Sequence, residues 1–99
     1  MFVVILKFED KSKAAASMEA HNDWIAKGFE DGVFLTVGTL QPSAGGAILA
    51  NGLDRAALDQ RLSEDPFIAE GVVSAEIFEI SPARTDPRLD FLKDSSAQN

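Results

Sequence analysis

The chain has 99 residues, the size of a single domain, and its 45% apolar and 25% charged residues are ordinary for a globular protein. Sixteen acidic against nine basic residues give a net charge of -7. Because no cluster of Lys or Arg interrupts this balance, a phosphate-binding surface is excluded, and with it nucleic acid as a partner. The absence of cysteine excludes disulfides, thiolate metal sites and cysteine nucleophiles, and it fits a cytoplasmic location.

The apolar start of the chain, residues 2–6, does not have the pattern of a signal peptide, because no basic region precedes it and Lys7 follows at once. No apolar run approaches the roughly 20 residues that span a bilayer. We therefore expect a soluble protein without a membrane partner.

Residues 2–8 are rich in β-branched and aromatic side chains, which predicts a strand. Residues 13–29 have apolar or small side chains three or four positions apart, which predicts an amphipathic helix with Ser12 as its N-cap. The positions with this spacing are Ala14, Met18, His21, Ile25 and Phe29.

The rest of the chain predicts three more strands and a second helix. We expect a strand over 33–37, a polar loop over 38–46, a strand over 47–50, a helix capped by Asp54 and ending at Leu62, and a last strand over 72–80. Asp65-Pro66 stops the second helix, and the polar run 94–99 is expected to be disordered. The order β-α-β-β-α-β predicts an α+β fold of the split βαβ type, with a four-stranded antiparallel sheet and two helices on one face.

The predicted sheet carries more apolar surface than two helices can cover. Its first strand is apolar on both faces. The last strand is as well, with Val73, Ala75 and Ile77 on one face and Val72, Phe78 and Ile80 on the other. Each large apolar side chain left in water forfeits roughly 1.5 to 3 kcal/mol. We therefore predict a homodimer through the sheet face that has no helices.

His21 is the single histidine, and its spacing from Met18 and Ile25 turns it toward the sheet. A buried imidazole needs a hydrogen-bond partner, so a structural role is the simpler interpretation, and an acid or base is the alternative. Asp65 precedes a proline, where the ordinary role of its carboxylate is to cap a turn. If the two side chains meet, the carboxylate fixes the imidazole tautomer and leaves the other nitrogen to move a proton.

Glycines surround the connection between the second and third strands, where Gly38, Gly45 and Gly46 bracket Ser43. Such a loop can bring backbone N–H groups close to an anionic oxygen, so Gly38, Ser43 and Gly46 are candidate substrate-binding residues. The spacing fits neither the dinucleotide fingerprint nor the Walker pattern, and hairpin geometry alone also explains these residues.

Trp24 follows His21 by three residues, so it is a candidate wall of the same pocket or a dimer contact, with a core position, usual for a lone tryptophan, as the alternative. A metal site needs clustered ligands, whereas this chain has one histidine, no cysteine and carboxylates scattered over exposed segments. We therefore expect no metal site.

Several of these segments together resemble the YCII-related family. They are His21 on its helix, the strand 32–38 that ends in glycine, residues 45–49, and Asp65-Pro66-Phe67 followed by Gly71. The resemblance covers most of residues 1–82 and leaves 83–99 as a C-terminal extension, either partly disordered or docked on a dimer partner through Leu89, Phe91 and Leu92. The family pattern has proline after the glycine of the second strand, whereas this chain has Thr39. The loop after Gly38, and with it the wall of the pocket, can therefore have another shape than in the family.

The resemblance implies a dimeric α+β barrel of ferredoxin-like halves, with a pocket around the family's His and Asp, here His21 and Asp65. The family includes a dehydrochlorinase acting on a chlorinated hydroxyquinol, and the fold is similar to that of muconolactone isomerases and cofactor-free monooxygenases. We therefore expect a cofactor-independent lyase or isomerase acting on a small aromatic or unsaturated acid, in which His21 shuttles a proton and Asp65 orients it. The alternative is a non-catalytic dimeric module that binds a small molecule or serves as an accessory subunit.

Overall fold

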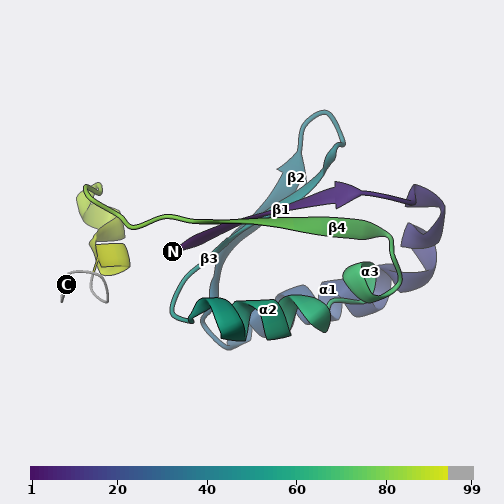
Figure 1. The fold of residues 1–99 in the computed structure, drawn as a ribbon, viewed down its shortest axis with the longest axis horizontal. Helices are drawn as coiled ribbons and strands as arrows, with labels where there is room; N and C mark the ends of the chain where they lie inside the picture. Colours follow the sequence, from purple (N-terminus) through teal and green to yellow (C-terminus); the bar gives the residue numbers. More distant parts are fainter. Residues whose placement is uncertain (94–99) are drawn as a thin grey trace.

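The structure, a computed structural model, describes residues 1–93, and the segment 94–99 expected to be disordered lies outside the described residues. One antiparallel sheet has the strand order β2-β3-β1-β4. The strands are β1 (Phe2–Phe8), β2 (Phe34–Leu40), β3 (Gly45–Ala50) and β4 (Val73–Glu79), and the helices are α1 (Ala14–Glu30), α2 (Arg55–Ser63) and α3 (Pro66–Ala69). The helices lie together on one face of the sheet (Figure 1). The predicted α+β fold of ferredoxin-like order is confirmed.

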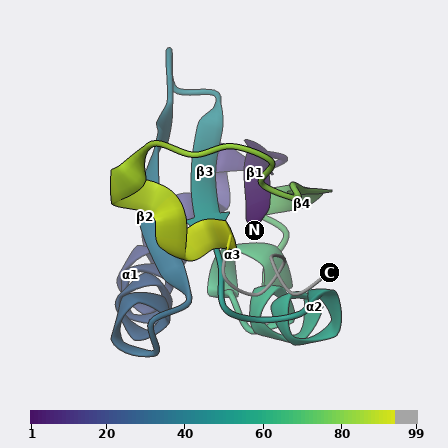
Figure 2. The ribbon, with the colours of Figure 1, turned by 90° about the vertical axis from the view of Figure 1, so that its left-hand side faces the viewer.

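The helices divide the covered face of the sheet between them. Seen along the sheet, α1 lies beneath the β2 side and α2 beneath the β4 side (Figure 2). Within the described part of the chain, no helix is both long and apolar enough to cross a membrane.

The connection between β2 and β3 is shorter than expected. Both strands run further toward the turn, so the polar loop predicted over 38–46 is reduced to 41–44, and Thr39 pairs with Gly46 in the sheet. At Gly45, the glycine that suggested a loop is required by the close approach of two backbones. Gly45 has a φ of +143°, and a Cβ atom there would overlap the backbone oxygen of Leu6 in β1.

The start of α1 also differs from the expectation, and Ser12 is not its N-cap. Asp10 caps a 3₁₀ turn, η1 (Lys11–Lys13), by accepting from the backbone N–H and the hydroxyl of Ser12. The α-helix begins after this turn, at Ala14, without a side-chain cap. The predicted cap of α2 is confirmed, because Asp54 accepts a backbone N–H from the first turn of that helix.

The face of α1 that meets the sheet is rotated from the predicted one. The buried residues of α1 are His21, Trp24 and Gly28, whereas Met18 and Phe29 are 43% and 45% exposed. Gly28 explains the rotation, because a Cβ atom there would overlap the ring of Phe34 in β2. The helix therefore approaches the sheet along its glycine, and the tryptophan and the histidine follow on the same face.

Among residues 1–93, no helix covers the opposite face of the sheet (Figures 1 and 2). Phe2, Val4 and Leu6 of β1 are buried on the helix side, and the alternating Val3 and Ile5 on the other side are only partly buried. The predicted apolar character of both faces of β1 is confirmed.

The predicted faces of the last strand are correct in part. Val73 and Ile77 lie on the helix side, and Phe78 lies on the open side opposite Val3, where it is 50% exposed. The prediction for Val72 was wrong: it precedes β4 and is fully buried in the core. Ala75 is exposed although it shares the helix side, because β4 is the edge strand of the sheet.

Beyond β4 the chain leads to a 3₁₀ segment, η2 (Pro87–Lys93), which Figure 1 shows near the N-terminus and away from α1. Leu92 is 3% exposed and lines a hollow of its own chain together with Met1 and Pro82. Leu89 and Phe91 are 42% and 45% exposed.

Candidate active site

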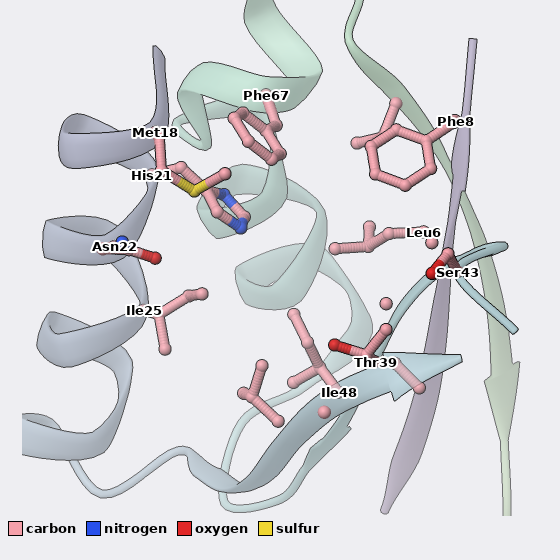
Figure 3. Close-up of a pocket in the computed structure, with 16 residues that line it drawn as sticks. Leu6, Phe8, Met18, His21, Asn22, Ile25, Thr39, Ser43, Ile48 and Phe67 are labelled. Atoms are coloured by element: carbon pink, nitrogen blue, oxygen red, sulfur yellow. The ribbon is translucent and has the colours of Figure 1, made fainter. Parts of the chain in front are cut away.

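A cavity of about 420 Å³ lies between the helices and the sheet, and Figure 3 shows side chains from α1, α3 and β1 around it. Most of its wall is apolar, and His21 is the only titratable side chain among the described residues that line it. The lining residues are Leu6, Phe8, Met18, His21, Asn22, Ile25, Val37, Gly38, Thr39, Ser43, Gly45, Gly46, Ala47, Ile48, Phe67 and Val73. Within residues 1–93, no group of three His, Asp or Glu side chains could hold a metal ion.

His21 and Asp65 are in contact. Nδ1 of His21 lies 2.7 Å from Oδ1 of Asp65, with the two side chains 11% and 0% exposed. Asp65 also caps α3, because the same oxygen accepts the backbone N–H of Phe67 at 3.0 Å. The sequence accounts for this local geometry, since Pro66 has no N–H to satisfy and its fixed φ suits the first position of a helix. The Asp65 carboxylate therefore caps α3 and contacts His21 at the same time.

The hydrogen bond to Asp65 fixes which nitrogen of His21 is available. A carboxylate oxygen that already accepts from a backbone N–H accepts from the imidazole as well, so the proton of the neutral ring lies on Nδ1. Within residues 1–93, Nε2 has no hydrogen-bond partner, and the ring lines the cavity. The arrangement leaves a lone pair on Nε2 to receive a proton from a bound molecule.

Phe67 covers the imidazole. Its ring is stacked on that of His21, with centroids 3.8 Å apart and planes inclined by 2°. The ring of Trp24 lies farther away, with its centroid 6.0 Å from that of the imidazole. Figure 3 shows His21 and Phe67 together on the helix side of the cavity, facing Leu6 of β1. The stack and the hydrogen bond restrict the imidazole to one orientation.

Asp65 lies behind His21 rather than in the cavity wall. It is fully buried and is not among the lining residues. Its second oxygen, Oδ2, is buried without a hydrogen-bond partner in the described part of the chain. A ligand in the cavity therefore meets the imidazole, and the carboxylate acts on that ligand only through His21.

The other predicted binding residues divide into two groups. Gly38, Ser43 and Gly46 line the cavity, on the wall opposite α1. Trp24 does not line it; its indole N–H donates to the backbone oxygen of Arg61 at 2.9 Å, and its ring packs edge-on against a core phenylalanine. Trp24 thus has the core position that was its alternative interpretation.

Most of the lining residues were not predicted, among them Asn22, Thr39 and Phe67. Asn22 follows His21 along α1, and Phe67 reaches the cavity through the turn that Asp65 caps. Thr39 lies on the sheet wall with Val37, two residues earlier. Strand alternation would have placed these two side chains on one face, but the sequence of this segment indicated a loop.

The comparison with protein families gives a match. The sequence model of the YCII-related domain matches residues 1–81. The matched segment contains β1 through β4, the cavity, His21 and Asp65, and it ends before η2. No curated protein matches the sequence. Since the match covers most of the chain, the resemblance noted from the sequence is confirmed, and the protein belongs to the YCII-related family.

Proposed function

We propose that the protein is a cofactor-independent lyase or isomerase that acts on a small aromatic or unsaturated acid, with His21 as both its base and its acid. The observation that carries the proposal is the position of this imidazole. Nδ1 is held by a buried carboxylate at 2.7 Å, and the ring faces an apolar cavity of about 420 Å³. Such a volume is typical of sites for small molecules.

The chemistry needs one proton acceptor that can return the proton. In an isomerisation, Nε2 of His21 removes a proton from carbon, the electron pair shifts along the unsaturated system, and the imidazolium protonates another carbon. In an elimination, Nε2 of His21 takes the proton, the electrons of the broken C–H bond form a double bond, and a chloride leaves the adjacent carbon with the electrons of its own bond. The imidazolium then returns the proton to water. In both cases the carboxylate of Asp65 stabilises the imidazolium that forms.

A homodimer through the open sheet face is part of the proposal. Val3, Ile5 and Phe78 leave apolar surface there, and a shallow hollow of about 320 Å³ beside Leu49 could receive partner side chains. His21 lies on the opposite side of the sheet, so each subunit would keep its own acid and base. The exposed residues of η2, Leu89 and Phe91, would dock on the partner.

The second candidate is a module that binds a small molecule without transforming it. The observation in its favour is that the cavity wall offers no acid or base besides His21 among the described residues. In this interpretation the contact with Asp65 only satisfies a buried imidazole.

The test begins with a thermal-shift screen of small aromatic and unsaturated acids, because a ligand at 100 times its dissociation constant adds about 2.7 kcal/mol of stability. Turnover of the acids that bind is then compared between the wild type, His21→Ala and the surface control Glu19→Ala on the same helix. We expect the turnover rate of His21→Ala to be lower by a factor of about 10² to 10⁴, with the fold and the oligomeric state unchanged. The control should remain active. A fully active His21→Ala protein contradicts the proposal, and binding without turnover in the wild type supports the second candidate.

A further inference from the structure

Lys11 connects two walls of the cavity. Its Nζ lies 5.0 Å from the centre of the Phe8 ring, and it donates to the backbone oxygen of Ser43 at 3.3 Å. Both of these residues line the cavity, one from β1 and the other from the turn between β2 and β3. The ammonium group is therefore placed beside the cavity, by a cation–π contact and a hydrogen bond.

The ammonium of Lys11 also has unused hydrogen-bonding capacity. Lys7 forms an ion pair with Glu76 on the neighbouring strand β4. Lys27 forms ion pairs with Glu30 and Asp31 at the end of its own helix. Lys11 has no carboxylate within ion-pair distance in the described part of the chain, and one backbone oxygen is its only acceptor there. An ammonium carries three N–H donors, so two of them are open to a ligand.

The rest of the cavity makes this cation important for an acid. Apart from His21, the described lining residues have no side chain that can carry charge, and the whole protein has a net charge of -7. An anion approaching the molecule is repelled by the overall field, so its binding depends on a local positive group. Lys11 supplies that group while the apolar wall receives the body of the ligand.

We infer that Lys11 determines specificity by binding the carboxylate of the substrate at the edge of the cavity, with the unsaturated or aromatic body lying toward His21. This inference rests on the proposed function, because it assumes that the ligand is a small acid. Lys11 is then a binding residue rather than an acid or base. Its charge selects acids over their neutral analogues.

The test compares two probes of equal shape, trans-cinnamate and its neutral amide trans-cinnamamide, in the full-length protein. Dissociation constants are measured by titration while the NMR signals of His21 report contact with the cavity. We expect the wild type to bind cinnamate about tenfold more tightly than the amide, a difference of about 1.4 kcal/mol. Lys11→Met should remove this preference by weakening the binding of cinnamate far more than that of the amide, whereas Lys11→Arg should retain most of it.

Lys13 provides the matched control. Neither lysine is itself a lining residue, and both belong to the same 3₁₀ turn, but the amine of Lys13 donates to the backbone oxygen of Glu70, which is not part of the cavity wall. Lys13→Met makes the same change in net charge and should keep the preference for cinnamate.

Two results overturn the role of Lys11 without touching the proposed substrate class. One is an equal loss of the preference for cinnamate in Lys11→Met and Lys13→Met. The other is equal binding of cinnamate and the amide by the wild type, with both probes shifting the signals of His21. If neither probe binds, the inference and the proposed substrate class fail together.

Discussion

The phenyl ring of Phe67 lies parallel to the imidazole of His21, and the backbone N–H of Phe67 donates to the same Asp65 oxygen that accepts from that imidazole. One buried oxygen therefore sets both the orientation of the histidine and the position of the ring that covers it. The turn formed by Asp65, Pro66 and Phe67 supplies the hydrogen-bond acceptor and the stacked ring, and α1 supplies the histidine that they hold.

Replacing Phe67 by Leu tests the stack. The variant keeps the apolar volume and the backbone N–H to Asp65, but it removes the aromatic face, whose pairing with another ring is worth about 0.5 to 1.5 kcal/mol. We expect a loss of stability of at least this size and a downfield shift of the His21 ring protons in the NMR spectrum, because the shielding by the phenyl ring disappears. Unchanged ring-proton shifts would show that the two rings do not stack in solution.

Replacing Asp65 by Asn tests the carboxylate. The amide oxygen can still accept from His21 and from the backbone of α3, but the negative charge is lost and the new NH₂ group replaces Oδ2, which is buried without a partner. A hydrogen bond to a charged group contributes about 1.5 to 3 kcal/mol and a neutral one about 0.5 to 1.5, so weakening these two bonds should lower the free energy of unfolding in urea by about 1 to 3 kcal/mol. The activation free energy of turnover should change by more than the free energy of unfolding, since no negative charge then stabilises an imidazolium at His21. Wild-type turnover in Asp65→Asn would remove Asp65 from the proposed mechanism.

The sequence predicted much of this fold and part of the site, for identifiable physical reasons. Strand composition, helical spacing and capping residues are local features of the sequence, so β1, α1 and the cap of α2 could be found from them. Contact between His21 and Asp65 could not be found in this way, because 44 positions separate them and only the fold brings them together. The short helix α3 was not predicted, because a single turn has no visible periodicity. The sequence indicated only that Asp65-Pro66 ends the second helix and that the Asp65 carboxylate caps a turn.

The pairing of α1 with α2 gives a pH-dependent prediction. The Arg61 guanidinium, at 2.8 Å, and then the Lys27 ammonium, at 3.2 Å, hold the pKa of the Asp31 carboxyl below its usual range. A carboxyl with a lowered folded-state pKa stabilises the fold above its unfolded-state pKa, and this contribution is lost as the pH falls through the folded-state value. Asp31→Asn should therefore unfold at lower urea concentration than the wild type at pH 7, and the difference should shrink on acidification.

The control for Asp31 is Asp59→Asn, which removes an ion pair in which both side chains are more than half exposed. Exposed pairs of this kind contribute about 0 to 1 kcal/mol, so the control should change stability little. If the difference in unfolding free energy between the wild type and Asp31→Asn stays constant down to strongly acidic pH, the carboxylate does not stabilise the fold through its charge.

The open sheet face gives the last prediction, which concerns the dimer. Phe78 on that face and Phe29 on α1 are similarly exposed, at 50% and 45%. A Lys at either position should therefore lower the unfolding free energy of the isolated subunit by about the same amount. Burying such a side chain is worth roughly 1.5 to 3 kcal/mol, and a two-fold interface counts it twice. We expect Phe78→Lys to weaken dimerisation at least tenfold in sedimentation velocity, and Phe29→Lys to leave it unchanged. A monomeric wild type at micromolar concentration, or equal weakening by both variants, would mean that this sheet face does not pair two copies, and its apolar side chains would then need another partner.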